Sequence, residues 1–70
     1  MRFITELAAI LSDIAQGYTH SALALTVAQA LPWANADDKA VLGRFLKGSH
    51  TERDCFALQA FAVLTHNHGN

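Results

Sequence analysis

The segment from Cys55 to Leu64, CFALQAFAVL, contains one polar side chain, Gln59, among ten residues. It lies within a predicted helix over residues 52–66. Successive helical residues are about 100° apart around the axis, so apolar side chains surround this helix and leave a narrow polar strip at Gln59 and His66. A helix that is apolar all round must be covered all round. Three other short helices cover about two of its sides, so we expect a second protein chain to contact this helix or a face beside it.

The N-terminal segment predicts an amphipathic helix over residues 2–16, which ends at Gly17 because glycine readily adopts the left-handed conformation that closes a helix. Its acidic and polar residues lie on the side opposite the apolar ones. The expected buried face follows the helical spacing and consists of Phe3, Leu7, Ile10, Leu11 and Ile14.

A second helix is predicted over residues 22–31, with Ser21 as its N-cap and Pro32 as the residue that ends it. Leu25 is expected to point away from the face that meets the core. Trp33 follows in the connection and is expected to cover the core as a lid. The predicted buried face consists of Leu23, Val27, Ala30 and Leu31.

A third helix is predicted from Asn35, its cap, to Gly48, which stops it. Its apolar stripe is Val41, Leu42, Phe45 and Leu46. The polar stretch GSHTERD that follows would suit a catalytic cluster, but SHTE and TERD both match a capping box, in which a hydroxyl residue precedes an acid by three positions. We therefore interpret the stretch as a joint between two helices, capped by Ser49 or Thr51.

These elements predict an all-α fold, a small bundle of four short helices completed by dimerisation. The expected domain covers residues 1–66, and residues 67–70 are expected to form a frayed C-terminal tail. A chain of 70 residues buries too little surface for high stability without help. One cysteine cannot form an intrachain disulfide, so the expected help is a metal or a second subunit.

Composition disfavours several classes of partner. Charged residues make up 16% of the chain and hydrophobic residues 51%, against about 25% charged in an average domain. The net charge is −1, so there is no strong electrostatic footprint for nucleic acid. No apolar run approaches the roughly 20 residues that span a bilayer, and acids interrupt any signal-peptide core. We expect a cytoplasmic protein that does not bind membranes.

The candidate catalytic and metal-binding residues are weak. A nucleophilic Cys55 would need a histidine such as His50 or His66 as its base, but its apolar neighbours favour an inert thiol. His66 and His68 form one close pair of metal ligands, whereas structural zinc needs four ligands. We predict no enzyme activity, no cofactor and no metal site.

DNA binding is the alternative function. The second and third predicted helices suit a helix-turn-helix, with Lys39, Arg44 and Lys47 on the polar face of the third. Asp37 and Asp38 lie at the end of that helix that would approach the bases, which disfavours this alternative.

The remaining class is protein–protein recognition. We predict a non-catalytic interaction module, a small helical regulator or inhibitor that forms a homodimer and binds another, unidentified protein through an apolar helix face. A charged residue at position 61 should weaken this self-association or unfold the chain. The predicted interface is drawn from the large side chains that interfaces favour, which here are Phe56, Leu58, Phe61, Leu64, Trp33 and Tyr18.

Overall fold

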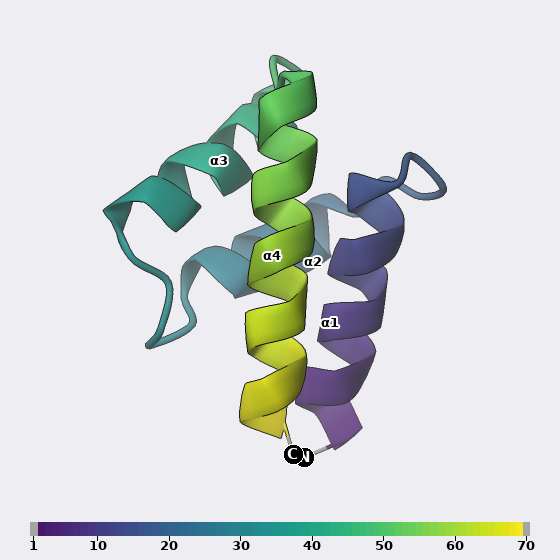
Figure 1. Ribbon diagram of the computed structural model, residues 1–70, viewed down its shortest axis with the longest axis vertical. Coiled ribbons are helices and arrows are strands. Elements are labelled where there is room, and N and C mark those ends of the chain that lie inside the picture. The colour runs from purple at the N-terminus through teal and green to yellow at the C-terminus, as the bar shows by residue number, and fades with distance from the viewer. Residues whose placement is uncertain (1, 70) are drawn as a thin grey trace.

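A computed structural model of the chain describes residues 2–69 and shows four helices without a strand in that range. They are α1 (Arg2–Ala15), α2 (Ala22–Gln29), α3 (Ala36–Lys47) and α4 (Glu52–Gly69). Helices α1 and α4 lie side by side and run in opposite directions, so the start of α1 and the end of α4 lie at the same end of the molecule (Figure 1). The predicted all-α fold of four short helices is confirmed; dimerisation stays a prediction.

The helix joints follow the local chemistry that the sequence predicts. The Ser21 hydroxyl accepts a hydrogen bond from the Ala24 backbone N–H at 3.2 Å. Asn35 and Asp38 form a capping box at the start of α3, with each side chain accepting from the other residue's backbone N–H. Gly48 ends α3 with a φ of 74°, a left-handed conformation that favours glycine. Each contact satisfies groups that a helix end leaves without an intrahelical partner.

The core lies where α1, α2, α3 and α4 converge. Helix α3 buries Val41, Leu42 and Phe45, as its apolar stripe predicts, with Leu46 half-buried beside them. Trp33 is also half-buried against the core. The core cluster consists of Leu7, Leu11, Ile14, Ala24, Leu25, Ala28, Leu31, Ala34, Val41, Leu42, Phe45, Leu58, Phe61 and Ala62.

Helix α2 turns a different face to the core from the one predicted. Leu25 is completely buried, whereas Leu23 is 75% exposed. Val27 is half-buried and Ala30 is exposed, so of the predicted face only Leu31 belongs to the core. The helix is apolar on nearly every side and offers little polarity to orient it. Its packing on α1 and α3 decides its rotation instead.

Helix α1 confirms the burial of Leu7, Leu11 and Ile14, with Ala8 buried beside them. The prediction that Phe3 and Ile10 belong to the buried face is wrong, because Phe3 is 57% exposed and Ile10 is 37% exposed. Both side chains lie at the edge of α1 that faces α2. Helix α2 is only eight residues long and leaves part of this edge uncovered.

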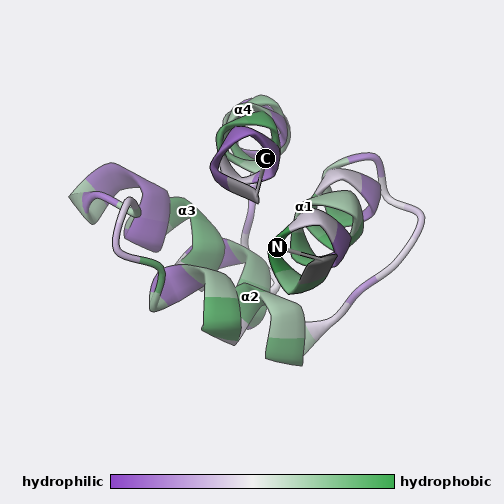
Figure 2. Ribbon diagram, turned by 90° about the horizontal axis from the view of Figure 1, so that it is seen from below, coloured by the Kyte–Doolittle hydropathy of each residue, from purple (hydrophilic) through white to green (hydrophobic). Residues whose placement is uncertain are grey.

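Helix α4 lies on the side of the molecule opposite α2, flanked by α1 and α3 (Figure 2). Its inner side buries Asp54, Leu58, Phe61, Ala62 and Thr65. Its outer side is open to solvent and still carries apolar side chains, with Phe56 71% exposed and Val63 52% exposed. The expectation that this chain covers only part of its last helix is therefore confirmed.

The last helix is three residues longer than predicted, because it continues through Gly69 rather than ending at His66. Residues 67–69, predicted as part of a tail, are helical, and residue 70 lies outside the described residues. The His68 ring stacks on the Trp33 ring with a centroid separation of 4.1 Å. Gly69 packs so closely on α1 that a Cβ there would lie 3.1 Å from the side chains of Ile4 and Thr5. These contacts explain the extra helical turn.

Candidate interaction surfaces

Two of the predicted interface residues lie in the core. Leu58 is completely buried and Phe61 is 4% exposed, so neither side chain can contact a partner in this fold. A charged residue in place of Phe61 would consequently disrupt the core and would not report on an interface. An all-apolar helix gives no polar face from which to tell inner positions from outer ones.

The outer side of α4 carries a continuous apolar strip formed by Phe56, Ala60 and Val63, which we call the α4 ridge. All three residues are exposed, and their spacing of four and then three residues places them on one side of a helix. Phe56 is a predicted interface residue, whereas Ala60 and Val63 are not. Their positions opposite Leu58 and Phe61 would have identified them once the buried side was known.

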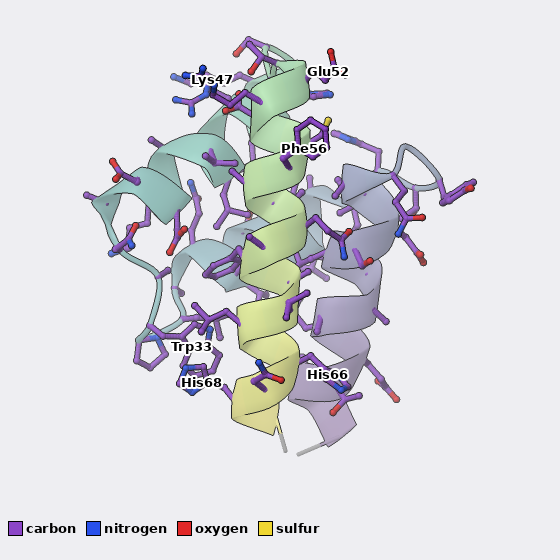
Figure 3. All side chains as sticks on the ribbon, viewed as in Figure 1. Trp33, Lys47, Glu52, Phe56, His66 and His68 are labelled. Carbon is purple, nitrogen blue, oxygen red and sulfur yellow. The ribbon has the colours of Figure 1, made fainter. Side chains whose placement is uncertain are left out.

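Trp33 lies on a different side of α4 from Phe56, and Leu64 follows the ridge residue Ala60 by one helical turn. The Trp33 indole N–H donates to the Thr65 hydroxyl at 3.3 Å, and its ring is covered by His68. Figure 3 shows Trp33 and His68 together on the α3 side of α4, with Phe56 and His66 on the α1 side. Leu64 is 39% exposed. Trp33 is thus held within the fold, and it does not form one surface with Phe56.

Tyr18 stands apart from the other predicted interface residues. It is 78% exposed in the connection between α1 and α2. It lines a shallow depression with Ile14, Phe45 and His50. The six predicted interface residues therefore divide between the core (Leu58 and Phe61), the α4 ridge and the position beside it (Phe56 and Leu64), the Trp33–His68 side of α4, and this connection.

A second exposed apolar surface lies between α1 and α2 and was not predicted from the sequence. Phe3 and Ile10 of α1 and Leu23 and Val27 of α2 line a groove with Leu7 and Ala24 on its inner side. We call it the α1–α2 groove. Glu6 and Ser21 are the polar residues among its lining. All four wall residues, Phe3, Ile10, Leu23 and Val27, were expected on buried helix faces, so the sequence did not indicate an exposed groove between them.

A third groove, between α1 and α4, adjoins the α4 ridge. The Ser12 hydroxyl donates to the Gln59 side-chain oxygen at 3.0 Å across it. Small side chains dominate its α1 wall, so α4 stands above its surroundings on this flank. The groove is lined by Thr5, Ala8, Ala9, Ser12, Gln59, Ala62, Val63 and His66.

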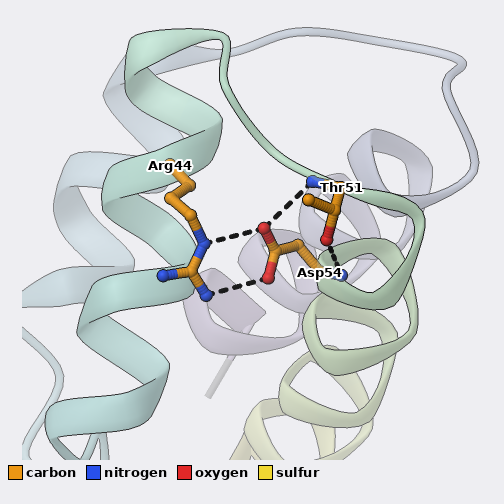
Figure 4. Close-up of polar contacts among 3 residues, drawn as sticks. All are labelled: Arg44, Thr51 and Asp54. Carbon is orange, nitrogen blue, oxygen red and sulfur yellow. Dashed lines mark hydrogen bonds and ion pairs between the residues drawn. The ribbon is translucent and has the colours of Figure 1, made fainter.

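The polar joint between α3 and α4 is built around Asp54. The Arg44 guanidinium donates to both carboxylate oxygens at 2.8 Å, and the Thr51 backbone N–H donates to one of them at 3.0 Å (Figure 4). The Thr51 hydroxyl in turn accepts from the Asp54 N–H at 3.3 Å. Thr51 is therefore the cap, in the TERD alternative of the predicted capping box.

These hydrogen bonds favour the charged forms of both partners. Those from Arg44, and then that from the Thr51 backbone, hold the pKa of Asp54 well below its usual range. The hydrogen bond to Asp54 raises the pKa of Arg44. A carboxylate held ionised by three donors is poorly suited to general acid–base work near neutral pH, so this cluster serves as a structural joint.

The residues of the DNA-binding alternative do not form one basic surface. Arg44 is engaged with Asp54, which leaves Lys39 and Lys47 of the predicted three. Asp37 and Asp38 occupy the first turn of α3, where Asp38 completes the capping box. This acidic end is the one that a recognition helix presents to bases, so the arrangement disfavours that alternative.

The histidines and the cysteine do not assemble a catalytic pair. Cys55 and His66 are eleven residues apart on one helix, a separation of about 16 Å at the usual helical rise. His50 stacks on Phe45 with a centroid separation of 4.1 Å, and His68 stacks on Trp33. Within residues 2–69 there is no group of three or more His, Cys, Asp or Glu that could hold a metal ion.

None of the helices in the described part of the chain is long and apolar enough to cross a membrane. Comparisons with protein-family models, with curated proteins and with solved structures find no match to this chain. The physical character of its surfaces is accordingly the guide to function.

Proposed function

We propose that this chain is a non-catalytic protein–protein interaction module, a small helical regulator that acts by covering part of another protein. The observation that carries the proposal is the gathering of exposed apolar side chains into the α1–α2 groove and the α4 ridge. Phe3, Leu23 and Phe56 are each more than half exposed. Scattered exposed hydrophobic residues are ordinary, whereas contiguous ones mark interaction sites.

The α1–α2 groove is the surface proposed to receive the other protein. Leu23 is 75% exposed and stands across the groove from Phe3 and Ile10. An amphipathic helix can place an apolar side chain between two such walls. Burial of apolar surface contributes about 25 cal/mol per Å² before the costs of association are subtracted. No catalytic group is required for this mode of action.

The test is capture of partners from the source cell with tagged intact protein, Leu23→Glu and Ala40→Glu. Leu23→Glu places a charge in the groove without touching the core. Ala40→Glu adds the same charge at an exposed position of α3 outside both apolar surfaces. We expect a protein that is captured by the intact chain and by Ala40→Glu but lost with Leu23→Glu. Equal capture by all three proteins would contradict a role for the groove.

A further inference from the structure

The spacing of residues along the outer side of α4 has the pattern of a helix–helix seam. Arg53, Phe56, Ala60, Val63 and Asn67 are separated by three, four, three and four residues, and all five are exposed. This is the alternation that keeps a stripe facing a second helix in a coiled coil. The three central residues form the apolar α4 ridge, and a polar residue stands at each end.

The ridge is complementary to itself when two copies of α4 run in opposite directions. In a symmetric pair, residue i contacts residue j and j contacts i. If Phe56 packs on Ala60 of a second copy, then Ala60 packs on Phe56 of that copy. A large side chain thereby meets a small one twice, which is the arrangement that lets facing layers interdigitate. Ala60 at the centre also lets the two backbones approach closely.

Charges at the two ends of α4 support the same arrangement. Glu52 lies at the start of the helix and His66 near its end, and both are exposed. They lie on the same flank of the ridge as Gln59, at intervals of seven residues. Opposite directions place Glu52 beside His66 of the second copy, where an imidazole N–H can donate to the carboxylate. Parallel helices would instead place Glu52 beside Glu52.

The surroundings of α4 leave room for this contact. An interface of ordinary size takes about 800 Å² from each partner, roughly a fifth of the 4349 Å² surface of this chain. The ridge alone is narrower than that, so the second helix must also cover a flank. The groove between α1 and α4, with Ala9, Val63 and His66 in its lining, is the flank that adjoins Glu52 and Gln59.

We infer that the partner of the α4 ridge is a second copy of this chain, packed with its α4 antiparallel to the first. Phe56 contacts Ala60 across the twofold axis, and Glu52 pairs with His66. The inference rests on the proposed interaction role, but it concerns a different surface from the α1–α2 groove. The groove remains open in such a dimer, because it lies on the far side of α1 from α4.

The first test is the mass of the protein in solution by sedimentation equilibrium. The intact chain should have twice the mass of the 7.6 kDa subunit at micromolar concentration, and Phe56→Glu should have the mass of the subunit. Leu23→Glu is the matched control and should keep the doubled mass. Circular dichroism should show the same helix content for all three, since both substituted side chains are exposed.

The second test is the direction of the two helices. Glu52→Cys and His66→Cys chains, each also carrying Cys55→Ser, are mixed and treated with a short bismaleimide cross-linker. Antiparallel packing predicts cross-linking of Glu52→Cys to His66→Cys. It predicts little cross-linking of Glu52→Cys to itself, because those positions lie about 20 Å apart at the usual helical rise.

Reversing the charges tests the register. Glu52→Lys should raise the dissociation constant of the dimer about tenfold, because the two exposed contacts between Glu52 and His66 are lost. Adding His66→Glu to Glu52→Lys should bring the dissociation constant back towards that of the intact chain, because Lys at position 52 then faces Glu at position 66 of the second copy. A double variant that dimerises no better than Glu52→Lys would overturn the register.

Three other outcomes would overturn the inference. They are a monomeric intact chain, a Phe56→Glu variant of doubled mass, and preferential cross-linking of Glu52→Cys to itself. None of them bears on the α1–α2 groove, because the test of the groove measures the capture of a different protein. Failure of the dimer and failure of the proposed function are therefore separate results.

Discussion

The Arg44 guanidinium and the Asp54 carboxylate form a bidentate ion pair that joins α3 to α4. Both donor–acceptor distances are 2.8 Å. The Asp54 side chain is almost fully buried, whereas that of Arg44 is 43% exposed. Asp54 also caps α4 through Thr51, so one carboxylate determines both where the last helix begins and how it meets its neighbour.

Asp54→Asn should lower the thermal unfolding midpoint at pH 7 and make stability less sensitive to acid. The pKa of Asp54 is depressed in the fold, so its stabilising effect is present above the ordinary carboxyl pKa of about 3.9. That effect is lost as the pH falls through the lower folded value. The difference between intact protein and variant should thus shrink towards pH 2. Thermal melts over this pH range measure it, with exposed Asp13→Asn as the control.

Phe61→Ala should destabilise the chain far more than Phe56→Ala. Truncation of a buried phenylalanine costs about 3–5 kcal/mol, which is a large part of the total stability of a domain of this size. Phe56 is exposed, and its truncation should change the stability of the monomer by less than about 0.5 kcal/mol. Urea unfolding of both variants at a protein concentration where sedimentation shows monomers separates this effect from dimerisation. Equal destabilisation would contradict the orientation of α4.

On α2, Leu25→Ala should likewise lower the free energy of unfolding far more than Leu23→Ala. Leu25 is completely buried, so its truncation should cost about 2–5 kcal/mol. Leu23 projects into the α1–α2 groove, and its truncation should be nearly neutral for folding. The free energies of unfolding from denaturant titration measure both. If Leu23→Ala were the more damaging change, the buried face first predicted from the sequence would be the correct one.

His68→Ala should shift the fluorescence of Trp33 to longer wavelength. Trp33 is the one tryptophan of the chain, and His68 covers one face of its indole ring. Removing the imidazole opens that face to water. Emission spectra of the folded proteins measure the shift, and His20→Ala provides the control at an exposed site in the α1–α2 connection. Identical spectra for His68→Ala and intact protein would argue against the stacking.

The capped helix ends were predictable because they depend on chemistry between near neighbours, whereas α2 ends at Gln29 instead of Leu31 and α4 continues past His66 to Gly69. Ser21, Asn35 and Gly48 act where the sequence places them, since a cap requires only a suitable side chain beside free backbone groups. For α4 the sequence left two possible N-cap residues, Ser49 and Thr51. Arg44 then favours Thr51, because Asp54 serves as its ion-pair partner and as the acid of the capping box.

The rotation of the helices was less predictable than their ends. In α2 and α4 apolar residues occupy nearly every side, so hydrophobic pattern alone does not distinguish Leu23 from Leu25, or Phe56 from Phe61. Packing among four helices decides which residue is enclosed. The same uniformity hid the α1–α2 groove and placed two core residues in the predicted interface.

The contact of Gly69 with Ile4 and Thr5 brings the first and last turns of the chain together. A linker of a few residues between the end of α4 and the start of α1 would therefore connect these two helices without moving either. New ends could then be opened in the exposed connection around Tyr18 and Thr19, where no helix would be interrupted. The fold is thus suited to circular permutation, in which α4 leads directly into α1 through a new internal loop.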